Sequence, residues 1–179
     1  MFGPLKALFK NNEPAAKVID KVWMSAEAKF QACVAMAHAN PACVFIGWFP
    51  ETVERLRQSL PEERLVLAER AASHTFEGRM IVFAEHHPLG RKEVALYKAL
   101  NLKEAPVLSS LDEPLFMQFG GERTIDLMKK LGMKEDEVVG SNLITKALRN
   151  AQRKIEEQVT VERDAHSQQE WFNLNLPSK

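Results

Sequence analysis

The sequence predicts an α/β protein, with a small and mainly parallel sheet of about four strands flanked by helices and followed by a C-terminal helical extension. Between residues 25 and 110, short apolar runs alternate with helical patterns, as in proteins built on a parallel sheet. Beyond residue 112, apolar residues recur only at the three-to-four-residue spacing of helices. A chain of 179 residues is long enough for one domain with a core of its own.

Four apolar runs are the expected strands. Residues 43–49 (CVFIGWF) are apolar at both alternating sets of positions, which is typical of a strand buried on both faces. Ile46 in this run, and Val82 in a later one, are expected to be almost fully buried. The other three expected strands are residues 64–68 (RLVLA), 80–84 (MIVFA) and, more weakly, 106–109 (PVLS).

The expected helices begin at residues that suit a helix N-terminus. Ser25 can cap a helix that runs to Ala39 and ends before Pro41. Pro50 suits the first turn of the next helix, and Gly90 opens a third that runs to about residue 100. Residues 69–79 are expected to form a loop. Further helices are expected over residues 112–119, 122–131, 134–138 and 141–157.

These elements divide the chain into four parts. Residues 1–19 are expected to be an irregular N-terminal segment, and residues 20–111 the α/β domain. Residues 112–157 are expected to be a helical extension packed on that domain. Residues 158–179 are expected to be a polar tail with an apolar end.

Composition excludes some classes of function. The chain has 24 Lys and Arg against 24 Asp and Glu, so its net charge of zero argues against a dedicated nucleic-acid binder. No run of residues is long and apolar enough for a membrane span, and the start lacks the pattern of a signal peptide. We therefore expect a cytoplasmic protein without an integral membrane segment. Cys33 and Cys43 are expected to be reduced, buried thiols.

Several stretches together resemble one known family. They include KVWMSAEAKF, PACVFIGWFPETVERLRQSL and FAEHHPLGRKEVAL, and the longest are SSLDEPLFMQFGGERTIDLMKKLGMKEDE and ITKALRNAQRKIE. From about Lys21 to Glu157 they resemble the second nucleotide-binding, helicase-like domain of the SecA preprotein translocase motors and the segment that follows it. The resemblance implies a helicase-like, P-loop-type α/β fold and a link to protein export.

The family's catalytic parts are missing from this chain. A phosphate-binding loop ends in Gly-Lys-Ser/Thr, and the sequence contains no Gly-Lys pair. The family's "ATNMAGRGTDI" segment is replaced by residues 69–79. The positions that match its three charge-stabilising arginines hold Tyr97, Ala99 and Leu102. The resemblance therefore implies a degenerate ATPase domain that binds a protein partner and has no catalytic residues, no cofactor and no metal.

One polar cluster offers an alternative to this interpretation. Glu85, His86 and His87 follow a predicted strand at its carboxyl end, where α/β sheets place their ligands, and Arg91 lies nearby. These residues could serve a small enzyme or a nucleotide sensor, or they could be a polar cluster inherited from the family motif "ERHESRR". The pair Asp112-Glu113 resembles the metal-binding carboxylates of an ATPase, but Asp112 is better explained as the N-cap of the helix that follows.

The apolar end of the tail consists of Trp171, Phe172, Leu174 and Leu176. Two explanations remain open. These side chains either pack onto their own domain or anchor an unknown protein partner, because aromatic residues are frequent anchors of interfaces. A nucleic-acid partner is not expected.

Overall fold

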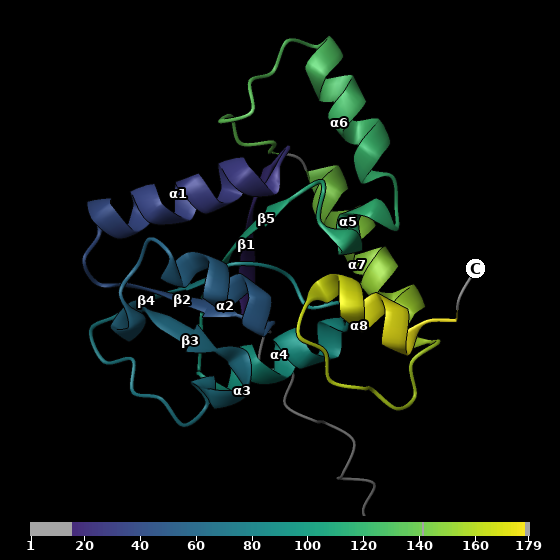
Figure 1. Ribbon diagram of the computed structural model, residues 1–179. Helices are drawn as coiled ribbons and strands as arrows, with labels where there is room; N and C mark the ends of the chain where they lie inside the picture. The colour runs from purple at the N-terminus through teal and green to yellow at the C-terminus, as the bar shows by residue number, and fades with distance from the viewer. Residues whose placement is uncertain (1–15, 141, 178–179) are drawn as a thin grey trace, which may run out of the picture.

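The computed structural model describes residues 16–140 and 142–177 of the chain, and its centre is a parallel β-sheet (Figure 1). In the described part, five strands are ordered β1-β5-β4-β2-β3 and every pair is parallel. Their bounds are β1 Lys17–Trp23, β2 Cys43–Gly47, β3 Leu65–Leu67, β4 Met80–Phe83 and β5 Glu104–Ser110. The α/β fold class is thus confirmed, with one strand more than expected.

The additional strand is β1, which begins inside the segment expected to be irregular; residues 1–15 of that segment lie outside the described residues. Its sequence, KVIDKVW, lacks the continuous apolar run of a central strand because β1 lies at the edge of the sheet. The strand forms through its pairing with β5, from Lys17 beside Glu104 to Trp23 beside Ser110. Such long-range pairing leaves no local signal in the sequence.

Helices cover both faces of the sheet. The first face packs against α1 (Ala26–Ala39) and α2 (Pro50–Arg57), and the second against α3 (Ala68–Ala71) and α4 (Gly90–Ala99), as Figure 1 shows. A short 3-10 helix, Glu62–Arg64, leads into β3. Ile46 and Val82 are fully buried, as predicted. The expected loop over residues 69–79 is shorter than predicted because α3 occupies its first part.

The C-terminal half is helical, as expected, but two details differ. It contains α5 (Pro114–Met117), α6 (Gly121–Lys130), α7 (Asn142–Glu156) and α8 (Gln168–Asn175). Residues 134–138 form turns rather than a helix. The backbone N–H of Val139 donates a hydrogen bond to the carbonyl oxygen of Val22 in β1, and this bridge holds the chain in an extended conformation. The polar tail contains α8, which Ser167 caps by accepting a hydrogen bond from the Glu170 N–H.

The apolar residues of α6 and α7 are only partly buried. Leu148 and Ile155 of α7 lie in the core, whereas Leu143 is 75% exposed, and Leu131, just after α6, is 68% exposed. An apolar cavity of about 510 Å³ lies between the two helices, lined by side chains that include Met128 and Ile144. No helix in the described part of the chain is long and apolar enough to cross a membrane.

Candidate functional site at the carboxyl edge of the sheet

The predicted polar cluster lies where the sheet topology favours a ligand site. Glu85, His86 and His87 directly follow β4, and the neighbouring strand β2 ends beside them at Gly47. The helix after β2 covers one face of the sheet and the helix after β4 covers the other. This divergence is the topological switch point at which α/β proteins open a binding crevice.

Glu85 fills this crevice with its own carboxylate. Its Oε1 accepts hydrogen bonds from the backbone N–H groups of Trp48 and Phe49, at 2.9 and 3.0 Å, and its Oε2 accepts one from the Thr52 hydroxyl at 2.7 Å. Phe49 is the N-cap position of α2 and provides no side-chain cap, so Glu85 satisfies the helix end instead. Burial raises the pKa of Glu85 to about 7, although the nearby Lys29 ammonium opposes this shift.

A buried ion pair lies next to Glu85. Lys29 of α1 donates to Glu113 Oε1 at 2.6 Å and to the carbonyl oxygen of Ala84 at 2.9 Å. Burial alone would lower the pKa of Lys29, but the charges of Glu113 and Glu85 outweigh it and the pKa is raised. Glu113 is therefore the counter-ion of a buried lysine, a role that its position beside Asp112 in the sequence did not indicate.

Asp112 caps a helix, but not the one expected. Its Oδ2 accepts a hydrogen bond from the backbone N–H of Ala26, at the start of α1, at 3.0 Å. The helix that follows it, α5, begins at Pro114, and its N-cap position, Glu113, makes no side-chain capping bond. The sequence predicted the wrong helix for this cap. The start of α1 is distant from Asp112 in sequence, and only the fold brings it to the end of β5.

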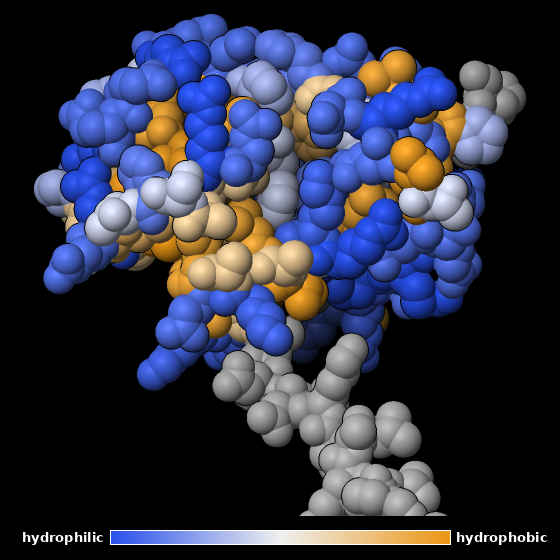
Figure 2. Space-filling view, turned by 90° about the horizontal axis from the view of Figure 1, so that it is seen from below, coloured by the Kyte–Doolittle hydropathy of each residue, from blue (hydrophilic) through white to orange (hydrophobic). Residues whose placement is uncertain are grey.

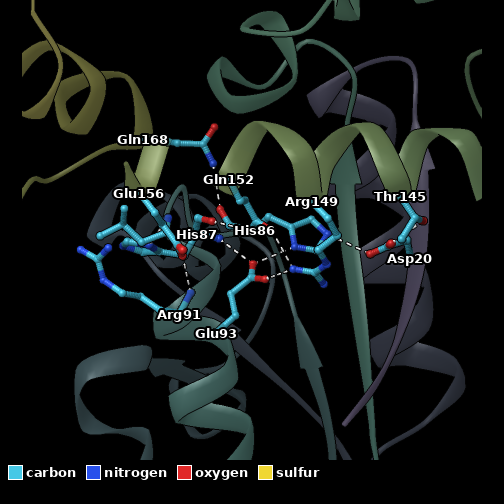
Figure 3. A network of polar contacts seen from close by, with 11 residues as sticks. Asp20, His86, His87, Arg91, Glu93, Thr145, Arg149, Gln152, Glu156 and Gln168 are labelled. Carbon is cyan, nitrogen blue, oxygen red and sulfur yellow. Dashed lines mark hydrogen bonds and ion pairs between the residues drawn. The ribbon is translucent and has the colours of Figure 1, made fainter. Parts of the chain in front are cut away.

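His86 is enclosed between two carboxylates (Figure 3). Its Nδ1 lies 2.8 Å from Glu93 Oε1 and its Nε2 lies 2.9 Å from Asp20 Oδ1. Burial disfavours the charged ring, but the two carboxylates outweigh it and raise the pKa of His86 to about 9. His86 is thus a buried imidazolium at neutral pH, and both of its ring nitrogens are engaged.

The same network fastens α7 to the sheet, as the dashed lines in Figure 3 show. Arg149 donates to Glu93 Oε2 at 2.8 Å and to Gln152 Oε1 at 2.7 Å, while Thr145 donates to Asp20 Oδ2 at 2.7 Å. Burial opposes ionisation of Glu93, but the His86 and Arg149 charges lower its pKa to about 2. The network therefore joins β1, α4 and α7 through fixed charges.

The backbone N–H of His87 donates to Glu93 Oε1 at 2.9 Å, but its side chain belongs to a different set of contacts. Its Nδ1 accepts a hydrogen bond from the Leu89 N–H at 3.0 Å, so the proton of the neutral ring is on Nε2, which lies 3.2 Å from Glu162 Oε1. Burial lowers the pKa of His87. Glu162 also accepts from the indole N–H of Trp171 at 2.8 Å and pairs with Lys92 at 2.8 Å.

The remaining predicted residues lie around this cluster, and Trp171 joins it through its hydrogen bond to Glu162. The backbone N–H of Arg91 donates to Glu156 Oε1 at 2.6 Å, and its side chain donates to the carbonyl oxygen of Val159 at 3.2 Å. Trp171 and Phe172 are buried in the domain's own core, at 1% and 5% exposure, which corresponds to the packing alternative. Leu174 remains 40% exposed, and Leu176 packs in part against the same core.

The tail crosses the carboxyl edge and borders an open cavity there. Gln168 donates to the carbonyl oxygen of His86 at 3.0 Å and accepts from the backbone N–H of Leu115 at 2.7 Å, so it ties α8 to the sheet. A cavity of about 770 Å³ lies between the tail, α4 and the ends of β2 and β3. His87 lines it, whereas Glu85 and His86 do not. Among the described residues, no group of three His, Cys, Asp or Glu side chains is placed to hold a metal ion.

Comparison with known proteins identifies SecA as a relative, although no family model matches the chain. The protein translocase subunit SecA of Acidithiobacillus ferrooxidans is 53% identical over 47 residues, 26% of this chain. The SecA subunits of Acinetobacter baylyi and Aquifex aeolicus are 27% and 30% identical over 118 and 112 residues, or 62% and 60% of this chain. These matches span only 5%, 13% and 11% of the three relatives. The chain is therefore related to a part of SecA.

Proposed function

We propose that this chain is a non-catalytic relative of the second nucleotide-binding domain of SecA, and that it acts as a protein-interaction module accessory to protein export. One observation carries the proposal. At the carboxyl edge of the sheet, the N-termini of α1 and α2 are both occupied by carboxylates of the chain itself, Asp112 and Glu85.

A helix N-terminus at this edge is where α/β nucleotide-binding proteins hold a phosphate, because the free N–H groups and the helix dipole attract anions. Here Glu85 accepts from the two N–H groups that precede α2. A phosphate in this position would displace a buried carboxylate or lie against it. The glycine before α2 has a packing role: a Cβ on Gly47 would lie 2.8 Å from Val53 Cγ2.

The sequence lacks the other groups that phosphoryl transfer uses. It has no Gly-Lys-Ser/Thr loop for the phosphates and the metal ion. Of the positions that match the family's arginines, Tyr97 is buried, and neither Ala99 nor Leu102 can donate to a phosphoryl oxygen. These absences support a binding role rather than ATP hydrolysis.

The alternative, a small enzyme or nucleotide sensor that uses Glu85, His86 and His87, has less support. His86 is fully enclosed and both ring nitrogens are engaged by carboxylates. Both oxygens of Glu85 accept hydrogen bonds from the chain itself. Of the three, only His87 borders the large cavity.

Two measurements test the proposal. Thermal unfolding with and without Mg·ATP or Mg·ADP should give the same midpoint, since a ligand that binds only the folded state raises it. Phosphate release should stay at the level of the protein-free control. Turnover above about 0.01 per second that is lost in Glu85→Gln would contradict the proposal, given that kinases reach roughly 1–100 per second.

The export link needs a separate test. Sedimentation velocity with the host's own SecA should reveal a complex whose formation does not depend on nucleotide. A mixture that sediments as two independent species would remove the support that the sequence relationship gives to this part of the proposal.

A further inference from the structure

We propose that the cavity under the tail is a docking groove for a basic segment of a partner protein, which inserts an apolar side chain between α4 and the tail. This inference rests on the proposed function, because it specifies the partner of an interaction module. At about 770 Å³, the cavity lies within the range of ligand-binding sites.

The floor of the groove is apolar and aromatic. Phe49, His87 and Trp171 are buried around it, with ring centroids 5.6 Å apart for Phe49 and His87 and 5.8 Å apart for His87 and Trp171. On α4, Ala95 and Ala99 are exposed and small, so they leave room above the floor. Figure 2 views the molecule from the side on which α3 and α4 lie, where apolar side chains gather across the middle of the face.

The rim of the groove is acidic, and this selects the partner. Four carboxylates line it, Glu69, Glu162, Asp164 and Glu170, whereas the lining contains one lysine, Lys92, which pairs with Glu162. Asp164 is exposed and forms no hydrogen bond or ion pair within the described residues, and Glu69 has only a 3.7 Å contact with its exposed neighbour Arg70. The negative charge of these carboxylates attracts lysine and arginine side chains, and the aromatic rings of the floor also attract cations.

A peptide titration tests the groove. The probes are fluorescein-labelled KLKLKLK, its acidic counterpart ELELELE, and KGKGKGK, which keeps the charge without apolar side chains. Fluorescence anisotropy should show binding of the lysine–leucine peptide and at least about tenfold weaker binding of the other two, which corresponds to about 1.4 kcal/mol. Equal binding of the lysine–glycine peptide would indicate unspecific charge attraction and overturn the proposal.

Charge reversal locates the site. The double variant Glu69→Lys/Asp164→Lys should weaken binding of the lysine–leucine peptide roughly tenfold, because it reverses the charge of two exposed rim carboxylates, of which, in the described part of the chain, only Glu69 has a contact, with Arg70. The matched control, Asp126→Lys/Glu135→Lys, changes two exposed carboxylates outside the groove by the same total charge and should bind like the parent. Equal affinities of the two variants for the lysine–leucine peptide would overturn the proposal that the peptide binds in this groove. If the two variants bound the peptide equally and no nucleotide bound, the docking groove would be wrong but the proposed function would stand. ATP turnover would instead contradict the proposed function itself.

Discussion

Glu85 caps a helix to which it does not belong: its Oε1 accepts a hydrogen bond from the backbone N–H of Phe49, at the start of α2, at 3.0 Å. The two residues follow adjacent parallel strands that end at the same edge of the sheet. The carboxylate therefore connects the end of β4 to the start of the helix after β2. This connection has a measurable pH dependence.

The pKa of Glu85 is raised to about 7 by burial, so the group stabilises the fold most at low pH. That contribution should decline as the pH rises from about 4.5 to 7, by roughly 3 kcal/mol for a shift of this size. Glu85→Gln can keep the two bonds from the backbone N–H groups on its amide oxygen and donate from its amide nitrogen to the Thr52 oxygen, all without a charge. This part of the decline should therefore disappear. Urea unfolding of both proteins between pH 4.5 and 8.5 measures the difference. Parallel curves would show that Glu85 does not titrate in this range.

His86 should titrate far above an ordinary histidine, because Asp20 and Glu93 hold its proton and raise its pKa to about 9. Its stabilising contribution is complete below about pH 6.5 and is lost as the pH rises through 9. Asp20→Asn should lower the pKa of His86, as measured by NMR of the ring Cε1–H. Asp164→Asn, an exposed carboxylate outside this network, should leave that pKa unchanged. Titration of His86 near 6.5 in the parent would contradict the buried ion-pair geometry.

Asp112→Ala should affect α1 rather than α5. The substitution removes the acceptor of the Ala26 N–H and should cost roughly 0.5–1 kcal/mol, as for an exposed N-cap. Hydrogen exchange should accelerate at residues 26–29 and remain unchanged at residues 114–117. Acceleration confined to α5 would instead agree with the cap expected from sequence alone.

Trp171→Ala should destabilise the whole domain. The indole is almost fully buried and donates to Glu162, so truncation should cost about 3–5 kcal/mol. Leu174→Ala, on the same helix but 40% exposed, serves as the control and should cost less than about 1 kcal/mol. Equal urea midpoints for the two variants would mean that α8 is not part of the core.

The sequence predicted the central strands because their burial is continuous, and Ile46 illustrates this with apolar neighbours on both sides. The edge strand β1 escaped prediction because its pattern is mixed and its partner is distant. The positions of Glu85 and His86 could be predicted, because α/β proteins place polar sites at the carboxyl ends of their strands. The hydrogen-bond partners of these two residues could not be predicted. Lys29 could have been noticed, since it precedes Cys33 by one helical turn on a buried face.

The network around His86 combines residues that no local pattern connects. Asp20, Glu93 and Arg149 come from three separate elements, and Asp20 and Arg149 each resemble an ordinary surface charge in the sequence. Only Glu93 carried a signal, because it shares a helix face with the buried Leu96 and Tyr97. Charge pairs between separate elements depend on tertiary structure, so this network could be recognised only in the folded structure.

The pairing of β1 with β5 also affects how the chain reaches this structure. Lys17 pairs with Glu104, so nearly the entire sheet lies between the two partners in sequence. Closing such a long loop is entropically unfavourable until the intervening strands have assembled, and non-local pairing of this kind slows folding. We expect β1 to join last during refolding and to detach first during partial unfolding. The buried imidazolium that joins β1 to α4 would then add to the free energy of that local opening, together with the pairing of β1 with β5.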